Sequence, residues 1–277
     1  MMLGSLYLEH LSDADLAFLG AAGQSRYDVR RDPDQLEALI DSTETFRALF
    51  TVAGRDPLLR GSPFLIFAVL VHRVVRDLRQ ATFIEEWVGP RQRVPVFDTE
   101  SLRDFGADPL RRLFLAELLA SYTNVANGST LVKTTRGWRR RRFSELDPLR
   151  LIELAEVVPD ADRPLVYRRL GDLSLFLTGI FPDYAGERLV AERDRGRLER
   201  MLGTAERERA DRHDGVWLLE QLGRRAYRIA QHGADRRAAM AAVLAEVSEN
   251  FAAARRVLNF LTDRYLFPMR RQWFGTG

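Results

Sequence analysis

The sequence predicts an all-α protein, a multi-helix bundle with one short β-hairpin inserted near its middle. Several segments open with a proline preceded by aspartate or serine, a pair that suits the start of a helix. Apolar residues then recur at helical spacing through most of the chain. One short β-prone segment before residue 145 breaks this spacing.

The expected helix starts share a side chain that can accept hydrogen bonds from the free N–H groups of the first turn. They are Asp32-Pro33, Ser62-Pro63, Asp108-Pro109 and Asp147-Pro148. Apolar residues follow each pair at helical spacing, so we expect a helix after each. A fifth pair, Asp56-Pro57, lies between Gly54 and Gly61, and there we expect a turn.

Two segments are dense enough in apolar residues to be buried helices. The segment from Ser62 to Ala81 is apolar around most of its circumference, which is typical of a helix at the centre of a bundle. The segment from Leu165 to Phe181 repeats the pattern. On the more polar stripe of the first segment lies His72, for which we expect a structural role.

The C-terminal third carries a heptad pattern from Met240 to Tyr265, with apolar residues at alternating spacings of four and three. We expect one long helix that packs lengthwise against a neighbour, for which Gly215–Gln231 is the candidate. The alternative is a homodimer through this seam, and periodicity does not separate the two. The dimer contacts would be Met240, Val247, Phe251, Leu258 and Leu261.

The predicted hairpin consists of Thr130 to Lys133, a turn from Thr134 to Gly137, and Trp138 to Phe143. Six of the ten residues from 133 to 142 are basic. Arginine matches phosphate oxygens, and an aromatic ring can stack on a base. We therefore expect a contact surface for nucleic acid or an acidic partner. Its residues are Lys133, Arg136, Trp138, Arg139, Arg140, Arg141 and Arg142.

The hairpin also has a structural interpretation. Successive strand residues lie on opposite faces, so both faces would be cationic and little of the hairpin could be buried. Its charges could pair with Glu145 and Asp147, or protect an edge strand from aggregation. An acidic protein or a lipid surface is a further alternative to nucleic acid. The chain has no evident helix-turn-helix spacing, which disfavours DNA.

A second candidate site lies in the C-terminal half, where charges stand beside apolar helix residues. It comprises Arg168, Arg169, Asp172 and Tyr227, which could border a ligand pocket between helices. The alternative is that these charges hold a helix end at the rim of the bundle. Gly223, nearby, is small enough to permit close helix approach.

Residue types and motifs that the sequence lacks exclude several classes of site. There is no cysteine, which removes disulfides, zinc-thiolate sites, iron–sulfur clusters and cysteine nucleophiles. The four histidines lack the spacings of di-iron or zincin helices. No glycine-rich phosphate loop or nucleophile elbow occurs. We therefore expect no metal and no cofactor and assign no catalytic residue. Carboxylates such as Glu85 and Glu86 are expected to be solvated.

The chain is expected to form two helical halves, residues 1–145 ending in the basic hairpin and residues 146–277, packed as one unit. The longest apolar run, Phe64 to Val71, is far shorter than the roughly 20 residues that span a bilayer. No signal peptide is evident, so we expect a cytoplasmic protein. The sequence favours a non-enzymatic binding or regulatory protein that contacts an anionic partner. The alternative is a small-molecule-binding or enzymatic bundle with its pocket in the C-terminal half.

Overall fold

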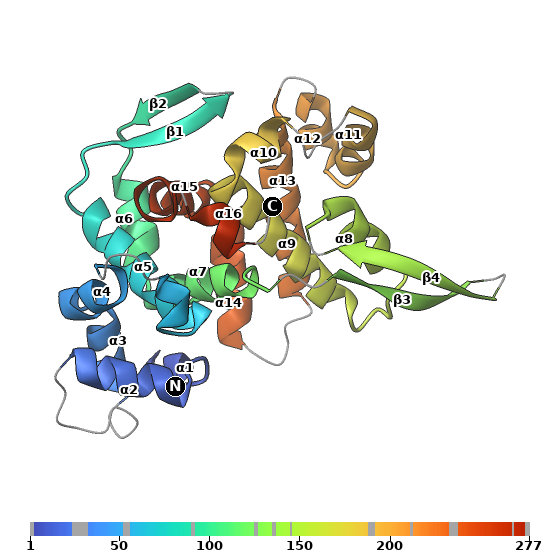
Figure 1. Ribbon diagram of the computed structural model, residues 1–277. Helices are drawn as coiled ribbons and strands as arrows, with labels where there is room; N and C mark the ends of the chain where they lie inside the picture. The colour runs from blue at the N-terminus through green and yellow to red at the C-terminus, as the bar shows by residue number, and fades with distance from the viewer. Residues whose placement is uncertain are drawn as a thin grey trace. The chain divides into compact units, whose positions relative to one another are not determined.

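The computed structural model describes residues 3–23, 33–51, 56–89, 92–124, 127–134, 137–144, 146–187, 192–210, 213–232, 238–267 and 269–274. Within these ranges lie sixteen α-helices and two separate two-stranded antiparallel sheets (Figure 1). The all-α class and the hairpin near the middle are confirmed. The other hairpin was not predicted. In the ranges described, no helix combines the length and the apolar character needed to cross a membrane.

The backbone contacts divide the chain into two compact units. The first consists of Met1–Thr82, Asp98–Asn124 and Asp263–Gly277, and the second of Phe83–Phe97 and Val125–Thr262. Neither unit coincides with a half of the chain, and the expected division near residue 145 stays a prediction.

The first unit is built around α5, whose side chains are buried along nearly its whole length. It packs most extensively against α7. The elements are α1 (Leu3–Leu8), α2 (Asp13–Ala22), α3 (Asp34–Ile40), α4 (Thr43–Phe50), the 3₁₀ turn η1 (Pro57–Leu59), α5 (Pro63–Leu78), α6 (Glu100–Ala107), α7 (Pro109–Ser121) and α16 (Arg270–Trp273).

The second unit is built around the pair α9 and α13, against which α14 and α15 pack. Its strands are β1 (Ile84–Gly89), β2 (Gln92–Val96), β3 (Asn127–Thr134) and β4 (Gly137–Ser144). Its helices are α8 (Pro148–Ala155), α9 (Arg163–Ile180), α10 (Pro182–Glu187), α11 (Glu192–Glu199), α12 (Thr204–Ala210), α13 (Gly215–Gln231), α14 (Ala238–Glu249) and α15 (Phe251–Leu261). A π-helical turn, η2 (Thr262–Leu266), follows α15.

Three of the predicted helix starts are confirmed as side-chain caps. The residues are Ser62, Asp108 and Asp147, each directly before a proline at the first helical position. The fifth pair, Asp56-Pro57, begins the short turn η1 instead of a helix. Asp32 lies outside the described residues, and the helix expected after it begins at Asp34.

A buried carboxylate joins the starts of two helices in the first unit. Asp15 forms a capping box with Ser12 at the beginning of α2. Its other oxygen, Oδ1, accepts a hydrogen bond from the Ser62 backbone N–H at 2.8 Å. Asp15 is only 1% exposed, so these donors replace the water that the carboxylate loses on folding.

Glycine allows the central helices of the second unit to approach closely. A Cβ at Gly223 on α13 would lie 2.5 Å from Phe251 Cε2 and 2.8 Å from Ser174 Cβ. On α9, Gly171 faces the ring of Tyr227, and Gly179 faces Leu258. The close approach expected at Gly223 is confirmed.

The heptad seam is divided between two helices, so the prediction of one long helix is wrong. Asn250 lies between α14 and α15 with φ −102° and ψ 29°. Its side-chain amide donates to the Glu246 carbonyl at 3.0 Å, a local bond that competes with the helical pattern. The apolar phase nevertheless continues across the interruption, from Leu244 to Leu261.

The seam packs inside the chain's own second unit. Val247, Phe251, Leu258 and Leu261 are each 0% exposed, and the expected neighbour Gly215–Gln231 is α13, which contacts α14 and α15. A homodimer through these residues would first have to expose them and stays a prediction. The side chain of Met240 lies outside the described residues.

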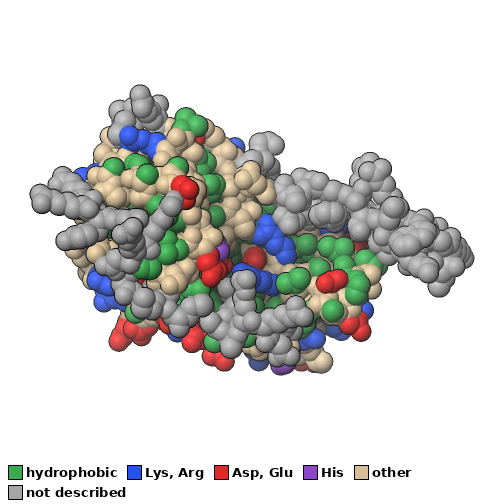
Figure 2. All heavy atoms as spheres, turned by 90° about the horizontal axis from the view of Figure 1, so that it is seen from below, with side chains coloured by type: hydrophobic (Ala, Val, Ile, Leu, Met, Phe, Trp, Pro, Cys, Tyr) green, Lys and Arg blue, Asp and Glu red, His purple; other side chains and the backbone are tan. Residues whose placement is uncertain are grey.

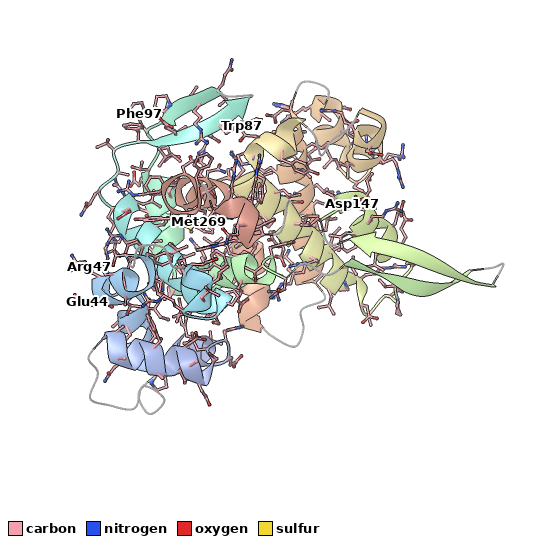
Figure 3. The ribbon with its side chains drawn as sticks, in the orientation of Figure 1. Glu44, Arg47, Trp87, Phe97, Asp147 and Met269 are labelled. Atoms are coloured by element: carbon pink, nitrogen blue, oxygen red, sulfur yellow. The ribbon has the colours of Figure 1, made fainter. Side chains whose placement is uncertain are left out.

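The hairpin that the sequence analysis missed is β1–β2. Trp87 on β1 is 5% exposed and lies against Gly186 of α10, where a Cβ would collide with the indole ring (Figure 3). Packing of one large aromatic ring on a glycine thus holds this short sheet in the second unit.

We predict that Gly223→Ala destabilises the protein. The added methyl group must displace Phe251 or Ser174, which costs about 1–3 kcal/mol in the free energy of unfolding. Urea denaturation followed by circular dichroism measures the change.

The matched control is Gly196→Ala in α11, because no atom lies within 4 Å of a Cβ built there. Here alanine should stabilise the helix by about 0.5–1 kcal/mol. Equal effects at the two positions would contradict the close helix approach.

Candidate functional site

The basic hairpin is present as β3 and β4, which pair antiparallel from Asn127 opposite Ser144 to Thr134 opposite Gly137. The strands form a two-stranded sheet of their own, and β4 contacts α8 (Figure 1). Arg136 and the side chains of residues 125–145 lie outside the described residues. The contact residues expected on this hairpin therefore stay predictions.

The backbone register shows what lies opposite the arginine run. The cross-strand partners of Arg139, Arg140, Arg141 and Arg142 are Val132, Leu131, Thr130 and Ser129, in that order. Lys133 is opposite Trp138. Directly opposed residues are the closest neighbours across a sheet. No position opposite the four arginines is therefore occupied by a carboxylate.

The structural interpretation pairs Asp147 with the charges of the hairpin. The carboxylate of Asp147 (labelled in Figure 3) instead caps its own helix, α8. Its Oδ1 accepts hydrogen bonds from the backbone N–H groups of Leu149 at 3.0 Å and Arg150 at 3.3 Å. Its Oδ2 lies 3.8 Å from the Arg150 guanidinium. The other suggested partner, Glu145, lies outside the described residues.

Charges of both signs are mixed on one face of the molecule. On the face drawn in Figure 2, basic and acidic side chains of the described residues lie among apolar ones. The sequence holds 42 basic and 39 acidic residues, so a strong positive field can arise only where basic residues cluster. The hairpin carries the densest such cluster in the sequence.

The second predicted site is an internal polar contact. The Tyr227 hydroxyl donates to Asp172 Oδ1 at 2.9 Å, and Arg168 Nε lies 3.9 Å from Asp172 Oδ2. Tyr227 is 0% exposed and its ring covers Gly171, whereas Arg168 and Arg169 are half-buried on α9. A described cavity of about 410 Å³ in this unit is lined by other residues, chiefly of α8 and α11. A ligand pocket at Asp172 stays a prediction.

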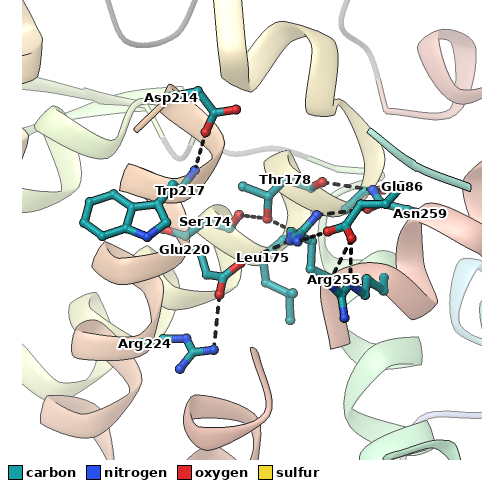
Figure 4. Close-up of polar contacts among 12 residues, drawn as sticks. Glu86, Ser174, Leu175, Thr178, Asp214, Trp217, Glu220, Arg224, Arg255 and Asn259 are labelled. Carbon is teal, nitrogen blue, oxygen red and sulfur yellow. Dashed lines mark hydrogen bonds and ion pairs between the residues drawn. The ribbon is translucent and has the colours of Figure 1, made fainter. Parts of the chain in front are cut away.

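A buried ion network joins α13, α15 and β1 (Figure 4). The Arg255 guanidinium lies 2.5 Å from Glu86 Oε1 and 3.2 Å from Glu220 Oε2. Arg256 binds the other oxygen of Glu86 at 2.9 Å, and Arg224 binds the other oxygen of Glu220 at 3.1 Å. Each carboxylate is therefore shared by two arginines.

Asn259 extends this network to α9. Its side-chain amide donates to the carbonyls of Thr178 at 3.0 Å and Gly179 at 2.8 Å, near the end of that helix. Its Oδ1 lies 3.4 Å from Arg255 Nη1. The network therefore pairs most of its buried polar groups among four elements, although Arg224 Nε has no hydrogen-bond partner among the described residues, and this internal pairing indicates a structural role.

The expectation that Glu86 is solvated is wrong, because its residue is 9% exposed on β1. Burial by itself would raise the pKa of its carboxyl group. Hydrogen bonds from Arg256 and the charge of Arg255 outweigh that effect and hold the pKa below its ordinary value. Glu85, its neighbour on the strand, points away and is exposed as expected.

A cavity of about 340 Å³ in the first unit was not predicted. Its wall includes His72, Arg76 and Arg79 of α5, which the sequence places on the polar stripe of an otherwise apolar helix. The spacing of four and three residues along that stripe was the signal in the sequence that could have indicated this cavity. The acidic residues that face it from α3 could not be assigned to it from sequence.

In the ranges that the structure describes, no group of three or more histidine, aspartate or glutamate side chains is placed to hold a metal ion. No protein-family model, curated protein or solved structure matches the chain. Its function must therefore be argued from its own residues.

We predict that Glu86→Gln lowers the free energy of unfolding by about 3 kcal/mol at neutral pH. The change removes a buried charge and leaves Arg255 and Arg256 without one of their partners. Urea denaturation at several pH values measures it, with Glu85→Gln on the exposed face of the same strand as the control.

The difference between wild type and Glu86→Gln should shrink in acid. Because the folded protein holds the pKa of Glu86 below its ordinary 4.5, the stability that this carboxylate contributes is complete above pH 4.5. It is lost as the pH falls through the lowered pKa. A difference that does not change with pH would show that the charge of Glu86 is not its source.

Proposed function

We propose that this protein is a non-enzymatic binding protein whose basic hairpin, Asn127–Thr134 with Gly137–Ser144, contacts a polyanionic partner, with nucleic acid as the first partner to test. The observation that supports the proposal most is the register. It places four successive arginines opposite uncharged residues. Their charge is therefore not cancelled across the sheet.

The separate, two-stranded form of the hairpin favours a binding role. Because β3 and β4 pair with each other, positions along β4 alternate between the two faces of a ribbon. Arg140 and Arg142 share one face, and Arg139 and Arg141 the other. Burying such a ribbon would cost several unpaired charges, so it suits a partner that supplies negative charge.

The dimensions of the arginine run suit a nucleic-acid backbone. Four strand residues cover about 13 Å at the usual rise per residue. A duplex strand places one phosphate about every 3.4 Å. The run therefore covers the axial rise of roughly four phosphates. Each face presents two arginines, and arginine binds phosphate oxygens through two parallel N–H groups.

We predict that changing Arg139, Arg140, Arg141 and Arg142 to serine weakens binding to nucleic acid and reduces its salt dependence. The slope of log K against log salt should become shallower by about 1.4 to 3.6, from contacts on one face to contacts on both, since each lost phosphate contact removes about 0.7–0.9. Fluorescence anisotropy with single-stranded DNA, duplex DNA and RNA at several salt concentrations measures it.

The matched control changes four exposed arginines outside the hairpin to serine, so that the net charge is the same. These are Arg200, Arg209, Arg225 and Arg228. Binding kept by the control and lost by the hairpin variant supports the proposal. Equal losses would indicate a general charge effect, and no salt-sensitive binding by the wild type would eliminate nucleic acid as the partner.

A further inference from the structure

The cavity of the first unit is polar, is open to solvent on one side and is lined by residues of three helices. It measures about 340 Å³, at the small end of the range for ligand sites. Its wall comprises Glu37, Ala38, Asp41, His72, Val75, Arg76, Arg79 and Arg112. These residues come from α3 and its C-terminal end, from α5 and from α7.

The imidazole of His72 is held from both sides. A hydrogen bond of 3.0 Å joins its Nε2 to the Tyr7 hydroxyl, and Asp41 Oδ1 lies 3.8 Å from its Nδ1. Burial raises the pKa of Tyr7, so its hydroxyl stays protonated. His72 is itself only 4% exposed. The ring therefore forms a fixed part of the cavity wall.

Two of the three arginines in the wall are anchored by carboxylates. Arg76 Nη2 lies 2.8 Å from Asp41 Oδ2, and its Nη1 donates to Thr43 Oγ1 at 2.9 Å. Arg112 pairs with Glu37. Burial by itself would raise the pKa of Asp41, but the neighbouring His72 and the Arg76 guanidinium outweigh that effect and lower it. Asp41 therefore remains an anion at neutral pH.

Arg112 is also fixed by backbone carbonyls, yet it keeps one unused donor. Its Nη1 donates to the carbonyls of Gly106 and Ala107, both at 2.9 Å. Its Nε is buried and has no acceptor in the part of the chain that the structure describes. A buried N–H without an acceptor is unfavourable.

The third arginine is available to a ligand. Arg79 is exposed at the C-terminal end of α5, and none of the described carboxylates forms an ion pair with it. The wall thus holds three guanidinium groups and two carboxylates. The guanidinium groups therefore outnumber the carboxylates by one.

We propose that this cavity binds a small polyhydroxy carboxylate, a site separate from the basic hairpin. One carboxylate group neutralises the single excess charge and can accept hydrogen bonds from Arg79. Glu37 and Asp41 accept hydrogen bonds from the hydroxyl groups. The same two carboxylates repel a dianionic phosphate, which sets the ligand class apart from the phosphate chemistry of the hairpin.

Three probes with one carbon skeleton test the ligand class. They are gluconate, glucose 6-phosphate and glucose, which carry a carboxylate, a phosphate and no charge. Isothermal titration calorimetry and the shift in Tm report binding to the full chain. We expect gluconate to bind most tightly, by at least tenfold over glucose. Tighter binding of glucose 6-phosphate overturns the carboxylate assignment, and equal binding of glucose overturns an anion site.

Two variants test the place of binding. Arg79→Gln removes the unpaired charge, and Ala38→Trp fills the cavity from the exposed side of α3 without changing any charge. Both should weaken gluconate binding at least tenfold and keep the helical circular dichroism spectrum of the wild type. Arg47→Gln removes an exposed arginine of α4 outside the cavity (Figure 3) and should bind like the wild type.

The outcomes are distinct. Loss of binding in Arg79→Gln and Ala38→Trp alone supports the proposal. Full binding by Ala38→Trp shows that the ligand lies elsewhere and overturns it. Equal weakening of gluconate binding by Arg47→Gln would mean that net charge alone causes the loss, and this also overturns the proposal. The absence of binding by all three probes overturns it as well. None of these results depends on whether the hairpin binds nucleic acid.

Discussion

The pairing of Arg255 determines how the core of the second unit is assembled. A guanidinium group that leaves water must find carboxylates at the right distance, or the folded state becomes strongly unfavourable. Arg255 on α15 finds Glu86 on β1 and Glu220 on α13, while Asn259 carries the network to the end of α9. Removing any one of these groups leaves the others buried and without one of their partners. The four elements therefore depend on one another electrostatically as well as through apolar packing.

The sequence predicted elements best where the deciding interactions are local. A cap such as Ser62 or Asp108 bonds an N–H group two or three residues away, so the pattern and the bond coincide. The break at Asn250 was missed because the apolar phase continues through it. The β1–β2 hairpin was missed because the contacts that hold it, Trp87 against Gly186 and Glu86 with Arg255, join residues far apart in the chain. Such contacts leave no periodic signal.

The same distinction applies to the candidate sites. The basic hairpin was predicted because all of its charges lie within one short segment. The cavity was not, because Asp41 and Arg112 lie 71 positions apart and only folding brings them beside His72. Glu86 and Glu85 look alike in sequence, yet one is buried among arginines and the other is exposed. Only the identity of the distant partner, which one sequence does not reveal, distinguishes them.

Segments of the two units alternate along the chain, and this order has a consequence for synthesis on the ribosome. In the first unit, Phe67 of α5 stacks with Phe274 at 5.6 Å and meets Trp273 edge-on at 5.8 Å. The Trp273 indole N–H also donates to Asp56 at 3.1 Å. Between α7 and these residues the chain must first supply the whole of Val125–Thr262. Phe67 therefore lacks its contacts with Trp273 and Phe274 until the second unit has emerged. During that time the nascent first unit exposes aromatic surface of the kind that chaperones bind.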